Sequence, residues 1–135
     1  MNSIEAKIFQ RGLWNKNVRL YLDRSFRDGK EWSYAVTEKF DETEHFDAIE
    51  LNGFVKENSI KTIDLLKIDI EGSEFKIFSK DSDLAFLSIT KSIAIEIHSE
   101  SGEIIEIINL LKDNGFELRV SGEYYIGINK NFNTI

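Results

Sequence analysis

The sequence predicts an open α/β fold formed by one domain, and three segments in its second half carry this prediction. Residues 63–68 are an almost continuous apolar run of strand length, typical of a strand buried in a parallel sheet. A second strand pattern follows at residues 92–98, and the clearest helical pattern of the chain at residues 103–114. Strands that alternate with helices in this way predict a parallel pair with helices covering the sheet faces.

The chain begins with two stretches in which apolar and polar side chains alternate. These stretches, residues 5–14 and 17–22, predict two strands, and residues 15–17 predict the turn that joins them. The side chains expected to point inward are Ile8, Val18, Leu20 and Leu22.

Residues 23–47 show no clear period and are rich in charge, so we expect a loop with one short strand near residues 32–36. Helical spacing returns at residues 48–58 and predicts a helix that leads into the strand at residues 63–68. Its expected core face holds Ile49, Phe54 and Val55.

Beyond residues 63–68 the sequence turns acidic at Asp69 and Glu71 before Gly72, as expected where a buried strand ends. A short helix should follow, with Ser73 as its N-cap. We expect Glu74 to be a first-turn helix residue rather than a catalyst, because acidic side chains favour the helix dipole there.

The last third of the chain has the most regular patterns. Alternation in residues 92–98 puts three isoleucines on one face and Ala94, Glu96 and His98 on the other. Residues 84–89 should form a short apolar segment before this strand. In the helix at residues 103–114, which Gly115 ends, the expected buried stripe is Ile104, Ile107, Ile108 and Leu111. The strands of the expected terminal hairpin are residues 116–120 and 124–128, joined through residues 121–123.

Composition restricts the kind of protein. The chain has 135 residues, the length of one domain, with 17 basic and 24 acidic side chains and a net charge of −7. Because its basic residues are scattered, nucleic acid and anionic membranes are not expected partners. No cysteine is present and the first residues do not resemble a signal peptide, so we expect a cytoplasmic protein.

The strand ends bring candidate functional residues together. If the two predicted strands are parallel neighbours, their carboxyl ends lie about 5 Å apart and Asp69 can face His98. Glu71 and Glu96 would join them in one acidic corner with a titratable imidazole. His45 lies in the irregular region and carries little weight.

Different readings of this corner remain open. Acidic residues before a helix can have a purely structural role, in which they interact favourably with the helix dipole. The same four side chains, Asp69, Glu71, Glu96 and His98, are also oxygen and nitrogen ligands that a metal-dependent hydrolase uses for a divalent ion. Since such sites usually contain more than one histidine, we expect no bound metal here.

Residues 63–78, IDLLKIDIEGSEFKIF, resemble the signature of the FkbM-type S-adenosylmethionine-dependent methyltransferases, where a hydrophobic strand runs into Asp-(Val/Ile)-Glu-Gly-x-Glu. The IEIH at residues 95–98 and the closing helix, Asn-Gly-Phe and hairpin are similar to the end of that family's domain. Residues 6–22 resemble its third strand and the following hairpin more weakly. The resemblance implies the carboxyl-terminal portion of a Rossmann-like class I methyltransferase sheet, with mixed parallel strands and a terminal antiparallel hairpin.

Two features of the resembled family are missing. These are a first strand that ends in a glycine-rich turn and a second strand that ends in a ribose-binding glutamate. The resemblance therefore implies an incomplete, truncated methyltransferase domain whose S-adenosylmethionine cradle is absent. We expect such a chain not to methylate anything alone, and to form a homo-oligomer through the open edge of its sheet. A non-catalytic remnant or interaction subunit is the alternative.

The resemblance and the chemistry of these side chains together suggest roles for the corner. Asp69, Glu71 and His98 would be catalytic, with Asp69 or His98 orienting the acceptor hydroxyl or taking its proton, and Asp69 would also face the cofactor. Glu96 would contact the substrate. The expected acceptor is a hydroxyl of a sugar, glycan or other small molecule.

Overall fold

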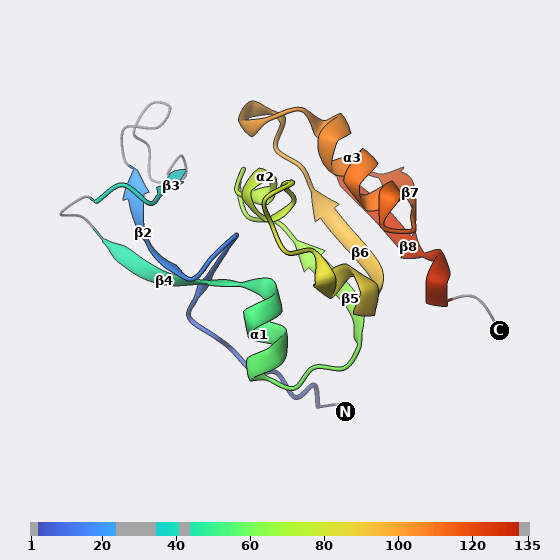
Figure 1. The fold of residues 1–135 in the computed structure, drawn as a ribbon, viewed down its shortest axis with the longest axis horizontal. Helices are drawn as coiled ribbons and strands as arrows, with labels where there is room; N and C mark the ends of the chain where they lie inside the picture. The colour runs from blue at the N-terminus through green and yellow to red at the C-terminus, as the bar shows by residue number, and fades with distance from the viewer. Residues whose placement is uncertain (1–2, 24–34, 41–43, 133–135) are drawn as a thin grey trace.

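The computed structural model describes residues 3–23, 35–40 and 44–132, which form an α/β fold with two mixed four-stranded sheets (Figure 1). The first sheet has the order β1-β4-β2-β3 and the second β5-β6-β8-β7. The strands of the first sheet are β1 (Gly12–Trp14), β2 (Val18–Asp23), β3 (Ala35–Thr37) and β4 (His45–Glu50). Those of the second are β5 (Ile63–Ile68), β6 (Thr90–Glu96), β7 (Phe116–Ser121) and β8 (Tyr124–Asn129).

The expected pairing of residues 5–14 with 17–22 is wrong, because β4 lies between β1 and β2. It runs parallel to β1 and antiparallel to β2, so Ala48 is paired with Gly12 on one side and Val18 on the other. Glycine at position 12 lets β1 and β4 lie this close to each other, because a Cβ there would come within 2.5 Å of the Phe46 ring. Leu20 is buried as expected, whereas Ile8 precedes the strand and is 88% exposed.

The region expected to be a loop contains β3 and the first half of β4. Strand β3 overlaps the expected strand at residues 35–36, and the remainder of that expected strand lies outside the described residues. Helix α1 (Leu51–Glu57) begins three residues later than residue 48, because residues 48–50 pair with β1. The Asn17 side chain accepts a hydrogen bond of 3.0 Å from the Glu50 amide, which fixes this strand end. Phe54 and Val55 pack on the core as expected.

The second sheet has the expected topology. Strands β5 and β6 are parallel, and β7 and β8 form the antiparallel hairpin, with β8 next to β6. The segments between the strands are α2 (Glu74–Ile77), the 3₁₀ turns at Ala85–Ile89 and Ser99–Ser101, and α3 (Ile104–Asp113), with a last 3₁₀ turn at Lys130–Phe132. Ser73 occupies the N-cap position of α2, but its side chain makes no capping hydrogen bond.

The main core lies on one face of this second sheet. Ile68, Ile93 and Ile95 point to the same side and pack with Ile107 and Leu111 of α3, all within one buried cluster. The opposite face is not covered by a helix in the described part of the chain, contrary to our expectation, and Leu65 on β5 is 60% exposed there. Strand β5 pairs only with β6 among the described residues, so its outer edge is free.

None of the helices formed by the described residues is long and apolar enough to span a membrane.

Candidate functional site

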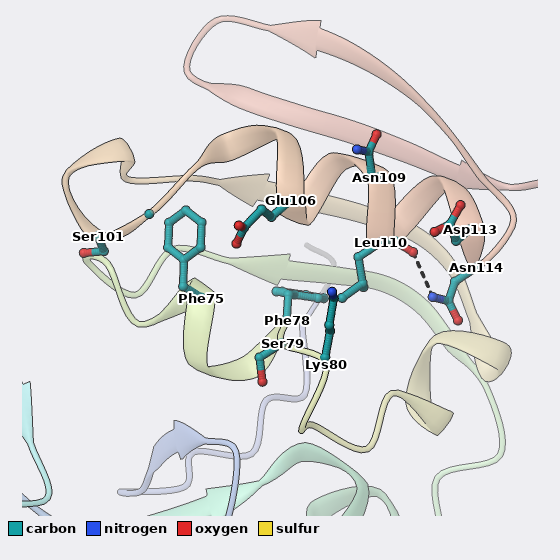
Figure 2. Close-up of a pocket in the computed structure, with 11 residues that line it drawn as sticks. Phe75, Phe78, Ser79, Lys80, Ser101, Glu106, Asn109, Leu110, Asp113 and Asn114 are labelled. Carbon is teal, nitrogen blue, oxygen red and sulfur yellow. Dashed lines mark hydrogen bonds between the residues drawn. The ribbon is translucent and has the colours of Figure 1, made fainter.

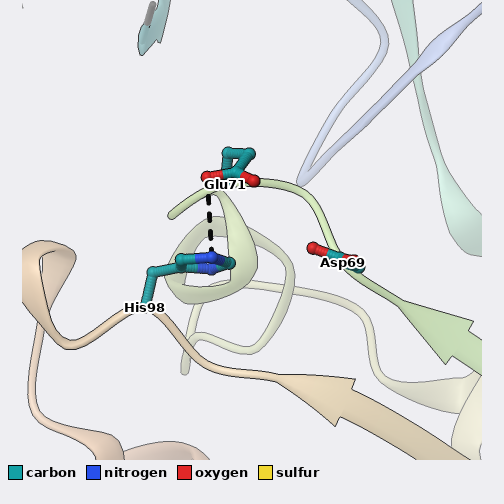
Figure 3. A group of neighbouring side chains, drawn as sticks. All are labelled: Asp69, Glu71 and His98. Carbon is teal, nitrogen blue, oxygen red and sulfur yellow. Dashed lines mark ion pairs between the residues drawn. The ribbon is translucent and has the colours of Figure 1, made fainter. Parts of the chain in front are cut away.

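The carboxyl ends of β5 and β6 bring Asp69, Glu71 and His98 together (Figure 3). One ligand atom from each of the three side chains can be chosen so that all lie within 4.8 Å of one another. Asp69 directly follows β5 and His98 follows β6 by two residues. The corner expected from the two strand patterns is therefore present in the fold.

Asp69 is held from the side of β8. Its Oδ2 accepts a hydrogen bond of 3.2 Å from the Tyr124 hydroxyl and lies 3.5 Å from Lys67 Nζ. The hydrogen bond with Tyr124 and the charge of Asp69 raise the pKa of Lys67, so this side chain keeps its positive charge beside the corner. Asp69 is thus an exposed side chain with two polar partners at the end of β5.

Glu71 lies in an unusual backbone turn. Its φ of +53° is in the left-handed region, which is uncommon for residues other than glycine, and Gly72 follows with a φ of +95°. A Cβ at Gly72 would lie 2.4 Å from Ser101 Oγ, so glycine lets the loop after β5 pack against the loop after β6. The turn places the Glu71 carboxylate 3.5 Å from His98 Nε2. Strained turns of this kind are concentrated at functional sites.

Glu74 is the residue that sequence reasoning missed. It is the first residue of α2, as expected, but it is 0% exposed and belongs to the corner. Its Oε1 lies 2.9 Å from His98 Nδ1 and accepts a weaker hydrogen bond of 3.4 Å from the Ile70 amide. Its Oε2 is buried, and no residue in the described part of the chain forms a hydrogen bond with it. Glu71 lies before the helix in a left-handed turn, so helical spacing does not relate the two residues, and the sequence contains no signal for the burial of Glu74.

His98 is surrounded by carboxylates and its side chain is 16% exposed. Burial lowers the pKa of His98, but the hydrogen bond with Glu74 and the charges of Glu74, Glu71 and Glu96 outweigh it, so the pKa is raised above the usual 6.5. Glu96 Oε1 lies 3.7 Å from His98 Nε2. Burial and the charge of Asp69 raise the pKa of Glu96 against the opposing effect of His98.

The arrangement supports two kinds of chemistry. One imidazole nitrogen meets a buried carboxylate, and the other faces a group of more accessible ones, as in a general base with an oriented ring. Three ligand atoms this close can also surround a cation. His45 takes no part, because it begins β4 in the other sheet, where its ring lies 6.0 Å from that of Tyr21.

A groove between α2 and α3 starts at the loop that follows His98 (Figure 2). Its volume is about 740 Å³, within the usual range for small-molecule sites. Phe75, Phe78 and Leu110 give it an apolar base, and Glu106 and Asp113 give it acidic walls. The sequence did not predict this groove, because it depends on how the two helices pack.

Comparison with known proteins adds to this geometry. The family described as "Methyltransferase FkbM domain" matches residues 3–118, a range that contains every residue of the corner. The "31-O-demethyl-FK506 methyltransferase FkbM" of Streptomyces tacrolimicus is 34% identical over 68 residues, which are 50% of this chain and 26% of that protein. No solved structure matches the chain significantly.

Proposed function

The chain belongs to the FkbM methyltransferase domain family, and from this membership we propose that it acts in S-adenosylmethionine-dependent transfer of a methyl group to a hydroxyl of a sugar or small metabolite. The observation that carries the proposal is the corner of Asp69, Glu71 and His98 at the carboxyl ends of two parallel strands. Ligands of open α/β sheets bind at this end of the strands.

The corner's own residues supply the removal of a proton. A hydroxyl that becomes an ether must lose its proton, and a base within hydrogen-bond reach accelerates this loss. We assign this role to His98 Nε2, which faces the corner while Nδ1 faces Glu74. Asp69, Glu71 and Glu96 would accept hydrogen bonds from the acceptor's hydroxyls and fix its position.

The residues of this chain do not fit the cofactor as a complete site. S-adenosylmethionine supplies an electrophilic methyl group when bound, and a class I arrangement holds it on a glycine-rich turn. This chain has eight glycines, and no two of them are separated by a single residue. The free outer edge of β5, beside Asp69, is where further strands of a Rossmann-like sheet would pair. We infer that residues other than these 135 hold the cofactor, and pairing with a second copy at this edge remains a prediction.

A chimera tests this proposal. Residues 63–129 of this chain would replace the corresponding segment of the Streptomyces tacrolimicus methyltransferase, and transfer of labelled methyl groups from S-adenosylmethionine to 31-O-demethyl-FK506 and to a panel of monosaccharides would be followed by mass spectrometry. We expect the chimera to methylate at least one hydroxyl compound. A chimera that folds, as judged by circular dichroism, and binds S-adenosylmethionine but transfers no methyl group would contradict the proposal.

The chain alone provides the matching control. Because the chain lacks a complete cofactor-binding site, it should show no binding of S-adenosylmethionine at micromolar concentration in calorimetry. Micromolar affinity would show that these 135 residues form a cofactor site by themselves, and our inference about the cradle would be wrong.

A divalent-metal hydrolase is the second candidate, favoured by the close ligand atoms of Asp69, Glu71 and His98. Thermal-shift titrations of the chain with Mg²⁺ and Mn²⁺ separate the two functions. A saturable rise in melting temperature that Asp69→Asn abolishes would favour the metal, because a cation bound to the native state stabilises it by mass action.

A further inference from the structure

We infer that Glu74 is a positioning residue, whose buried carboxylate holds His98 with its proton on Nδ1 and so leaves Nε2 free to face the corner. The role of Nε2 toward an acceptor hydroxyl rests on the proposed methyl transfer. The hydrogen bond and the tautomer do not, and they can be measured separately.

The first argument is the burial of Glu74. A carboxylate that is 0% exposed is costly unless it is paired, and apolar side chains of similar size often stabilise such positions better. Glu74 packs at the start of α2, which also contributes buried Ile77. Its Oε2 is buried and has no hydrogen-bond partner among the described residues. A buried carboxyl group with so few partners among the described residues is better explained by its effect on His98 than by stability.

The second argument concerns the proton. Oε1 of Glu74 is already an acceptor, since it accepts the Ile70 amide hydrogen, so the 2.9 Å contact with Oε1 places a hydrogen on Nδ1 of His98. In the neutral ring, Nε2 then carries the lone pair. Nothing else among the described residues contacts Nδ1 within hydrogen-bond distance, so Glu74 alone sets this choice.

The third argument is the space around Nε2. The distances from Nε2 to Glu71 Oε2 and Glu96 Oε1 are 3.5 and 3.7 Å, longer than the usual 2.7–3.2 Å of N–H···O hydrogen bonds. Nε2 is therefore not engaged in a short hydrogen bond with either carboxylate. A hydroxyl group placed near all three atoms could donate to Nε2 or to a carboxylate.

A purely structural role is the competing explanation, because Glu74 also accepts the Ile70 amide hydrogen and begins a helix. Such a role would affect stability but not the tautomer of His98. The tautomer and pKa of the ring are therefore the measurements that separate the two roles.

The test is a pH titration of the ¹⁵N-labelled full chain by NMR, with long-range ¹H–¹⁵N correlations of both histidine rings. His45→Asn identifies the His98 signals, since the chain has two histidines. We expect neutral His98 to be protonated at Nδ1, the opposite of the tautomer that predominates in free histidine. A wild-type spectrum with the proton on Nε2 would overturn the inference.

Two variants distinguish charge from position. Glu74→Leu should return neutral His98 to the tautomer of free histidine, and Glu74→Gln should lower its pKa. Glu96→Gln is the matched control, because it removes a negative charge on the other side of the ring, near Nε2. This variant should also lower the pKa of His98, but it should leave the proton on Nδ1. An unchanged tautomer in Glu74→Leu would overturn the inference. If that variant does not fold, the wild-type tautomer and the direction of the pKa change in Glu74→Gln decide.

These results are independent of methyl transfer. A chimera without activity, together with the expected tautomer, would reject the proposed function and keep the pair of Glu74 and His98. An active chimera, together with a wild-type chain in which neutral His98 carries its proton on Nε2, would keep the proposed function and reject the role of Glu74.

Discussion

Replacing His98 with glutamine in the chimera is expected to slow methyl transfer by about 10²–10⁴-fold, the usual contribution of a positioned general base. Glutamine keeps a polar side chain near the corner but cannot take a proton at neutral pH. Turnover measured with saturating S-adenosylmethionine and acceptor checks this value. The loss should appear in kcat, because the base acts on the transition state rather than on binding.

The pH dependence provides a second measurement on the same pair of proteins. Only neutral His98 can accept a proton, and the hydrogen bond with Glu74 and the surrounding carboxylates raise the pKa of His98 despite its burial, so the active form is reached at a higher pH than in a free imidazole. The rate of the unsubstituted chimera should therefore rise with pH through the pKa of His98, and this rise should disappear in His98→Gln. Equal pH profiles in both proteins would show that His98 is not the base.

Replacing Ile107 with alanine is expected to lower the free energy of unfolding by about 2–5 kcal/mol. Ile107 is 0% exposed and attaches α3 to the core face of the second sheet. The truncation removes buried apolar surface and leaves a cavity that the packed sheet cannot fill completely. Unfolding of the full chain in urea, followed by circular dichroism, measures this loss.

Ile105→Ala is the control on the same helix. Ile105 is 55% exposed, so its truncation should change stability by no more than about 0.5 kcal/mol. A loss below about 1 kcal/mol for Ile107→Ala would mean that α3 does not pack on the sheet in solution.

The second sheet could be predicted because its local patterns agree with its long-range contacts. Isoleucines at positions 93 and 95 alternate with less apolar residues and lie on the buried face as the alternation requires. The stripe of α3 follows helical spacing, and Ile107 and Leu111 are its fully buried members. Strands β5 and β6 are joined through α2, and β7 and β8 are the two strands of a hairpin, whereas the pairing of β6 with β8 spans α3 and β7.

The first sheet could not be predicted because its pairing depends on distant residues. Ala48 and Ile49 fit helical spacing equally well, and it is the pairing with β1 and β2, 30 or more residues earlier, that makes them part of a strand. In the site, the strand ends gave the positions of Asp69 and His98 correctly. Glu74 was missed because a first-turn glutamate is ordinarily exposed, and its burial arises from packing that the sequence does not reveal.

The separation of the two cores has a consequence for hydrogen exchange. Among the described residues, the buried core of the first sheet contains Trp14, Leu20 and Ala48, whereas the second sheet shares a much larger cluster with α2 and α3. Local opening requires less free energy where fewer apolar contacts are lost. The amides of β2 and β4 should therefore exchange before those of β6 and β8. Glu74 and His98, which belong to the slowly exchanging part, would remain in place while the first sheet opens and closes.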